Sequence, residues 1–196
     1  STEKNLTAIT NATAPVVTAT GHGFSNGDYV EVTSGWGALN GRVMKISGVA
    51  TDTFKLEGID TSDTEKYPAG AGIGSVRKIT TWTQVTQIME FSTSGGEQQY
   101  VNYGFLEEDF ERQLPSITSA QSLTIGIADD PNLAGYKALK AANEKRTNTG
   151  LRLNLRDGSV IAYNGVVSLN ETPSTTKGQV MQVQATFALQ GRPTRY

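Results

Sequence analysis

Three stretches in the second half of the chain carry apolar residues at every other position. The positions between them hold mainly Thr, Asn, Arg or Gln, so an extended segment has one apolar and one polar face. This alternation predicts half-buried strands of an antiparallel sheet. Residues 156–159, with Asp-Gly at the centre, predict a hairpin turn between two such strands. The apolar positions are Leu123, Ile125 and Ile127, then Leu151, Leu153 and Leu155, then Met181, Val183, Ala185, Phe187 and Leu189.

The first 78 residues show shorter apolar segments, each bounded by turn sequences. Residues 26–28 (Asn-Gly-Asp) and 40–41 (Asn-Gly) are typical of tight turns, because these residue types tolerate positive φ. We expect a small β-barrel or sandwich over residues 1–78 and a second domain over residues 79–196. The strands predicted in the first part cover residues 15–19, 29–33, 42–49, 53–56 and 73–79.

One stretch of the second part has helical spacing, and we expect a helix over about residues 131–146. Acidic residues followed by proline at 129–131 predict its N-cap and first turn. Cations at 145–146 with Gly150 behind them predict its end. The predicted fold is therefore mainly β, with an antiparallel β-sandwich and one helix, an α+β arrangement, in the second domain. The apolar helical positions are Leu133, Tyr136, Leu139 and Ala142.

Composition narrows the function classes. The 196 residues include no cysteine, which excludes disulfides, thiolate nucleophiles and Cys-based metal sites. The longest apolar runs fall far short of the roughly 20 residues that cross a bilayer, and the first residues lack the layout of a signal peptide. We therefore expect synthesis in the cytosol and no membrane contact. The net charge of −2, with scattered Lys and Arg, is not that of a tight nucleic-acid binder.

The only histidine, His22, stands between two glycines and invites a search for chemistry. No second histidine, no cysteine and no serine in a nucleophile-elbow setting accompanies it. We interpret the stretch 20–28 as a turn in which glycines supply positive φ and His22 packs or hydrogen-bonds. No catalytic residue, metal site or cofactor is expected, and the chain is not expected to be an enzyme.

Two polar groups remain open to more than one interpretation. The charge run 107–112 is consistent with acid–base or hard-cation chemistry, with a solvated or subunit-contacting surface, or with a wall that repels a polyanion. The polar side of the last strand has two interpretations. Either it simply faces solvent, or the strand is a sheet edge that lacks the charged residues which usually prevent pairing, and it pairs with a neighbouring subunit. That polar side consists of Gln182, Gln184, Thr186 and Gln190.

The second part of the chain resembles the major tail tube proteins of long, non-contractile bacteriophage tails. The resemblance runs in order over about residues 80–196 and is carried by five segments. These segments are 94–101 (SGGEQQYV), 106–115 (LEEDFERQLP), 120–131 (AQSLTIGIADDP), 169–173 (LNETP) and 180–195 (VMQVQATFALQGRPTR).

The first part is similar to a small β module common in phage structural proteins. Residues 21–28, 39–41, 52–56 and 58–61 carry this likeness, which extends in pattern to a half-domain of ubiquitin-activating enzymes. Ubiquitin chemistry does not follow from it, because the activity of those enzymes lies elsewhere and this chain lacks cysteine.

The tail tube resemblance implies assembly without catalysis. Subunits of this family form hexameric rings with a closed inner β-barrel, and the rings stack around a tape-measure protein into the conduit for DNA ejection. Implied partners are further copies of the chain, the tape-measure protein, the tail terminator and tail-tip proteins, and passing double-stranded DNA. The expected location is the virion tail after assembly in the host cytoplasm. The alternative is a decoration module, or a module that binds carbohydrate or a host surface.

The same resemblance supplies candidate site residues. Long loops and terminal segments contact neighbouring rings in this family, and a compact extra module fits better outside the ring than inside the channel. Carboxylates on the lumen wall would repel DNA phosphates. The candidate inter-subunit contacts are Gly95, Gly96, Glu97, Gln98, Glu111, Arg112, Pro115 and Arg192, and the candidate acidic lumen residues are Glu90, Glu107, Glu108 and Asp109.

Overall fold

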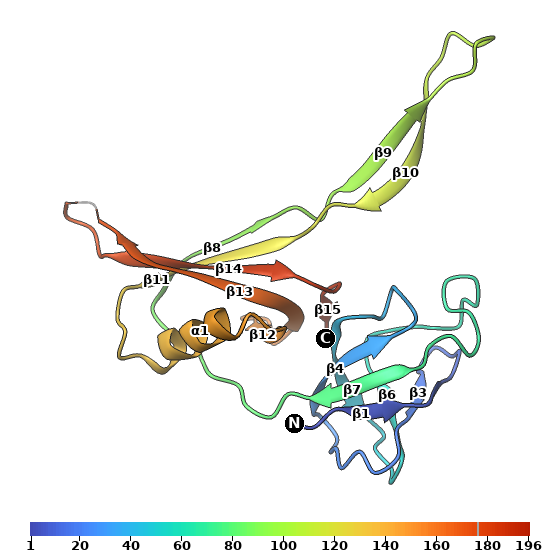
Figure 1. The fold of residues 1–196 in the computed structure, drawn as a ribbon, viewed down its shortest axis with the longest axis horizontal. Helices are drawn as coiled ribbons and strands as arrows, with labels where there is room; N and C mark the ends of the chain where they lie inside the picture. The colour runs from blue at the N-terminus through green and yellow to red at the C-terminus, as the bar shows by residue number, and fades with distance from the viewer. Residues whose placement is uncertain (176) are drawn as a thin grey trace.

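The computed structural model describes residues 1–175 and 177–196, and it confirms the predicted fold class. The chain builds two curled antiparallel sheets, a two-stranded arm and, within these described ranges, one helix. Figure 1 shows the first sheet at lower right, the second sheet and helix at left, and the arm projecting toward upper right. The arm projects far beyond the two sheets and makes the molecule elongated.

The first sheet is built from residues 4–78, and its strand order is β1-β7-β4-β5-β6-β3-β2. It curls around an apolar core in which Trp36, Phe54 and Met44 are almost fully buried. The five strands predicted in this region are present, and two short ones precede them. The strands are β1 (Lys4–Leu6), β2 (Ala8–Ile9), β3 (Val16–Thr18), β4 (Tyr29–Ser34), β5 (Arg42–Ser47), β6 (Thr53–Leu56) and β7 (Gly74–Lys78).

The second sheet has the strand order β12-β13-β14-β11-β8, with the short strand β15 beside β13. Its members are β8 (Ile88–Ser94), β11 (Ser122–Ala128), β12 (Thr149–Asn154), β13 (Val160–Ser174), β14 (Gln182–Leu189) and β15 (Thr194–Arg195). The predicted alternating apolar residues that lie within β11, β12 and β14 share one face, where Leu123, Phe187 and Val167 stand side by side in register. Met181 and Leu155 lie outside these strands, and Met181 is half exposed. The shared face packs on the helix and forms the second core.

Helix α1 (Ala134–Lys145) covers that apolar face through Tyr136 and Leu139. The acidic N-cap predicted from the sequence is wrong. Leu133 occupies the N-cap without a side-chain hydrogen bond, because the Asp130 carboxylate instead accepts the Asn132 N–H in a turn before the helix, at 3.0 Å.

The helix also ends differently from the sequence prediction. Lys145 lies in the last turn as expected, but Arg146, with φ 51°, provides the left-handed C-cap and donates its N–H to Ala142. Gly150, expected to stop the helix, instead lies inside β12. The predicted hairpin turn at 156–159 is confirmed, with the Asp157 carboxylate accepting the Ser159 N–H at 2.9 Å.

An aromatic seam joins the first sheet to the start of β13. Tyr29 meets Trp82 and Tyr196 edge-on, with ring centroids 5.5 and 6.2 Å apart, and the Arg152 guanidinium lies over Tyr29 and Trp82. Buried Ala162 of β13 completes this small core. The two sheets are therefore packed against each other and not merely tethered through residues 79–87.

A buried carboxylate adds polar contacts to the same seam. Glu31 of β4 forms an ion pair with Arg77 and accepts amide hydrogens from Asn164, at 2.8 Å, and Asn148, at 3.2 Å. Asn164 also donates to the Gly41 carbonyl, at 3.0 Å. A carboxylate removed from water is stable only when it is paired in this way, so these contacts fix how the sheets meet.

The carboxyl-terminal residues run through this seam. The Tyr196 hydroxyl accepts the Lys45 N–H at 2.7 Å, and burial raises the pKa of Tyr196 to about 12. Arg42 donates to Thr194 at 2.8 Å, and burial lowers the pKa of Arg42. Gly191 is required here, because a Cβ at that position would lie 2.1 Å from the Gly41 carbonyl oxygen.

Candidate functional site

The second sheet has a face that neither the helix nor the first sheet covers. Strands β8, β11, β14 and the second half of β13 (residues 166–174) contribute to it. The side chains are small or neutral, as in the register row Ser92, Thr124, Thr186 and Ser168. We call it the uncovered face, and it comprises Glu90, Ser92, Ser94, Ser122, Thr124, Gly126, Ala128, Val166, Ser168, Asn170, Gln182, Gln184, Thr186 and Ala188.

The uncovered face carries no lysine or arginine at these described positions, and Glu90 is its one charged residue. Glu90 stands opposite Gly126, on the edge strand β8. The other acidic lumen candidates, residues 107–109, lie elsewhere, at the tip of the arm. The structure therefore separates Glu90 from residues 107–109 (Figure 1).

The polar strand of glutamines is not an edge, and that alternative interpretation is wrong. Gln182 and Gln184 belong to β14, which lies between β13 and β11. The open edge is on β8, which within the described residues pairs only with β11. On β13 the edge away from β14 is partly occupied, since Asn143 of α1 accepts the Leu169 N–H at 3.2 Å.

The arm comprises residues 95–121 and continues the β8–β11 hairpin beyond the sheet. Its strands β9 (Gln98–Tyr103) and β10 (Arg112–Thr118) pair with each other, with Val101 opposite Leu114 and a register shift between Pro115 and Thr118. No other element of the described chain packs on either face of this ribbon (Figure 1). An isolated two-stranded ribbon is marginally stable in water, and this one has no core of its own.

Large apolar side chains line the arm and are open to solvent. Tyr100, Val101, Leu114 and Ile117 are each more than half exposed along its shaft. At the tip, Leu106 is fully exposed and Phe110 is 71% exposed. Such a concentration of exposed apolar surface is typical of protein contact sites. Sequence reasoning placed candidate contacts in this segment but missed its apolar side chains, although Phe110, inside the densest charge run, was a usable signal.

The base of the arm holds four of the candidate contact residues. Gly95 and Gly96 have φ of 77° and 84°, and a Cβ on Gly95 would lie 1.9 Å from the Ala120 carbonyl oxygen. Glu97 accepts the Ser119 N–H at 2.8 Å, and the Gln98 amide donates to Ser116 at 3.0 Å. These residues set the direction in which the arm leaves the sheet.

The remaining candidates lie in two places. Glu111, Arg112 and Pro115 are exposed on the arm, where Arg112 pairs with Glu108 at 2.8 Å. This pair is solvent-exposed and contributes little stability, so the acidic tip stays available for other contacts. Arg192 is exposed in the turn between β14 and β15, beside the seam with the first sheet and away from the arm.

The structure gives His22 a packing role. Its Nδ1 accepts the Phe24 N–H at 3.0 Å and its Nε2 lies 3.1 Å from the Ala50 carbonyl, which assigns the proton to Nε2. The buried ring also packs against Phe24 and Phe54. Both ring nitrogens are thus used by the fold.

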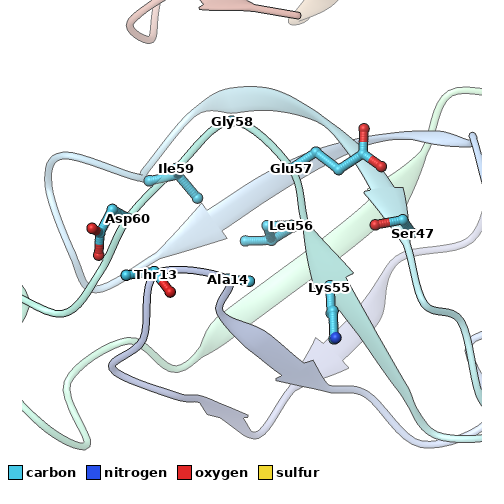
Figure 2. Close-up of a pocket in the computed structure, with 9 residues that line it drawn as sticks. All are labelled: Thr13, Ala14, Ser47, Lys55, Leu56, Glu57, Gly58, Ile59 and Asp60. Carbon is cyan, nitrogen blue, oxygen red and sulfur yellow. The ribbon is translucent and has the colours of Figure 1, made fainter.

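A shallow pocket of about 450 Å³ lies on the first sheet. Figure 2 shows Glu57 and Asp60 at opposite sides of it and Lys55 directed away from both. Glu57 is already paired with Lys45 at 3.2 Å. Because a ligand site needs polar groups that converge, this pocket is a poor candidate for one.

Residues 1–175 and 177–196 contain no group of three or more His, Cys, Asp or Glu residues placed to hold a metal ion. Over the same residues, no helix combines the length and apolarity needed to span a membrane.

The mainly β fold, the uncovered face and the arm define a structural protein that assembles through its surfaces. The family model of the phage tail tube protein, TTP, matches residues 34–196, so the chain belongs to the phage tail tube protein family. It is a structural component of the virion tail and not an enzyme. A comparison with curated proteins gave no match. The family match begins at Ser34, the last residue of β4, and therefore includes much of the first sheet. It does not test the likeness of residues 21–61 to a separate module, which stays a prediction.

Proposed function

We propose that six copies of the chain form a ring and that rings stack into the tail tube through which DNA leaves the virion. The uncovered face is the observation that carries this proposal. Four strands present a wide surface of Ser, Thr and Gln with a single carboxylate and no cation at the described positions. Each lysine or arginine contact to a phosphate would add salt-sensitive affinity for DNA, so a face without them lets DNA slide.

The open edge of β8 supports ring closure. An exposed edge offers unpaired N–H and C=O groups to another strand. A strand from a neighbouring copy placed beside β8 would continue the sheet, and repetition around a ring would leave no open edge. Such contacts join different surfaces of two identical chains, and they close if the rotation per subunit divides a full turn.

The arm supports stacking between rings. It leaves the sheet at the end of β8 and projects with exposed apolar residues on a ribbon that lacks a core. We propose that Gly95 to Gln98 orient the arm and that Glu111, Arg112 and Pro115 contact a neighbouring ring. Arg192, at the seam, is proposed to reach a neighbour from the other side.

We propose that residues 1–78 form a module on the outside of the tube. The first sheet packs against β15 and the start of β13, which leaves the uncovered face free for the lumen. Glu90 is the proposed lumen carboxylate, whereas residues 107–109 at the arm tip are better placed for contact between subunits. The tape-measure, terminator and tip proteins are the proposed partners, with assembly in the host cytoplasm.

Electron microscopy of negatively stained protein tests this function. The purified chain, imaged over a range of concentrations and salt, is expected to give rings and hollow tubes. Monomeric particles under every condition would overturn the proposal. Deletion of residues 1–78 tests the alternative role of that part in surface or carbohydrate binding, for which the pocket in Figure 2 gives no support.

A further inference from the structure

A groove of about 550 Å³ opens on the helix side of the second sheet, between β8, β12 and the segment 81–85. Its apolar lining includes Trp82, Val85, Phe91 and Leu153, and Phe91 remains 40% exposed because nothing in the described chain fills the space. A volume of this size encloses about two or three large side chains. Arg152 is the single charged residue among the described residues that line it, and its guanidinium lies over the ring of Trp82, which also lines the groove.

The arm tip has the complementary chemistry. Phe105, Leu106 and Phe110 are 52%, 107% and 71% exposed. Phe105 packs edge-on against Tyr103 of the arm itself, with ring centroids 5.8 Å apart. The three apolar residues are interspersed with the acidic residues of the run 107–111, of which only Glu108 is paired, with Arg112. An apolar tip with excess negative charge matches an apolar groove whose one charge is positive.

The placement of the two surfaces requires two copies of the chain. The arm leaves the sheet next to Ser94, whereas the groove reaches Ile88 at the opposite end of the same strand, about 20 Å away. The arm also projects away from α1 and β12, two elements that line the groove (Figure 1). A tip at one end and a receptor at the other make a heterologous contact that repeats along a stack.

We infer that the arm tip of one copy inserts into the groove of a second copy, with Phe105 and Phe110 as the buried side chains and Arg152 facing the acids. This inference rests on the proposed stacking of rings and names the surface that receives the arm. It also explains why Ile88 and Phe91, on the helix side of β8, are left exposed in a single copy. The contact would bury both sets of apolar residues at once.

Cysteine cross-linking between two differently tagged variants tests the contact, because the chain has no cysteine of its own. Leu106→Cys marks the tip and Thr83→Cys marks the exposed groove rim. Mixed, assembled and oxidised, these chains are expected to form a disulfide-linked heterodimer. The matched control is Thr13→Cys, at an exposed site on the first sheet, which is expected to give at least tenfold less heterodimer with Leu106→Cys.

The outcomes separate this inference from the proposed function. Tubes that form without the Leu106→Cys and Thr83→Cys link would overturn the groove contact and leave the tube role intact. A link from Thr83→Cys to Lys137→Cys of a second copy, with none to the tip, would assign the groove to a lateral neighbour's helix and equally overturn it. The expected link in particles that are not rings or tubes would support the contact and count against the tube.

A second variant pair does not depend on cross-linking. Phe105→Ser combined with Phe110→Ser removes apolar side chains that make no core contact, so folding is expected to persist. The concentration at which assembly begins should rise at least tenfold, as measured by sedimentation. Ile73→Ser, an equally exposed apolar residue on the first sheet, should leave it unchanged. Equal effects of the two changes would overturn the insertion of the tip.

Discussion

At the residue scale, Tyr196 links the seam between the sheets to pH. Burial raises its pKa from 10.0 to about 12, so between these pH values the folded chain keeps a proton that the unfolded chain has lost. The contribution of Tyr196 to the free energy of unfolding is therefore fully present below about pH 10 and is lost as the pH rises toward about 12. At about 1.4 kcal/mol per pKa unit, the loss is about 2 to 3 kcal/mol.

The Tyr196→Phe variant tests this linkage by urea unfolding at pH 9, 10, 11 and 12. The variant loses the hydrogen bond to Lys45 but has nothing left to titrate at this position, so its stability should fall less steeply over the window. The same slope in both proteins would contradict the assigned cause.

His22 is predicted to matter for folding and not for assembly. His22→Ala removes the acceptor of the Phe24 N–H and leaves a gap beside Phe54, which should lower the free energy of unfolding by about 2 to 4 kcal/mol. Ser25→Ala, at an exposed neighbouring position, should change it by less than about 0.5 kcal/mol. Chemical denaturation measures both values. Tube formation that fails in folded His22→Ala protein would refute the purely structural role.

At the element scale, the direction of the arm depends on Gly95. Gly95→Val would place a branched side chain against the Ala120 carbonyl, in a backbone conformation that valine avoids. The arm should leave the sheet at a changed angle, and assembly should be lost while both cores stay folded. Sedimentation measures assembly, and circular dichroism measures folding. Gly104→Ala, at the other end of the arm where nothing lies closer than 4.0 Å, is the matched control and should assemble.

The elements that could be predicted from the sequence are those whose physics is local. Turn residues delimit the strands of the first sheet, and alternation reveals β11, β12 and β14 because one face of each is buried within the same chain. Strands β8, β9 and β10 gave no such signal, since their apolar side chains are exposed in a single copy. The helix start was misjudged because the Asp130 carboxylate bonds locally before the helix begins.

The candidate site residues show the same difference between local and long-range information. The resemblance placed Gly95 to Gln98, Glu111, Arg112 and Pro115 among the candidate contacts, and all of these lie on the arm, whereas the candidate Arg192 lies between β14 and β15. Sequence gave no means to distinguish Glu90 from residues 107–109, because the two groups differ only in their long-range position. The apolar tip and the groove could not be predicted, because the proposed contact between them joins two copies of the chain. A single sequence gives no information on contacts between copies.

At the scale of the whole molecule, the uncovered face should determine how fast DNA passes through the tube. Thr124→Lys combined with Thr186→Lys places two cations per chain on this face, where the side chains stand opposite each other. Virions with this tube should retain or release DNA more slowly, and the effect should shrink with added salt. DNA release timed by dye fluorescence measures it.

The control for that experiment places the same charges at a different position on the chain. The same charge change on the first sheet, Thr13→Lys combined with Thr7→Lys, should leave release unchanged, because the module is proposed to lie outside the tube. Equal delays from both double variants would show that net charge, and not the lining of a channel, governs release.

The most direct test of the account is a helical reconstruction of assembled tubes by electron cryomicroscopy. The account predicts rings of six subunits in which β8, β11, β14 and β13 line a central channel, Glu90 points inward and the first sheet lies outside. Tubes whose channel is lined by the helix side of the second sheet or by residues 1–78 would contradict it.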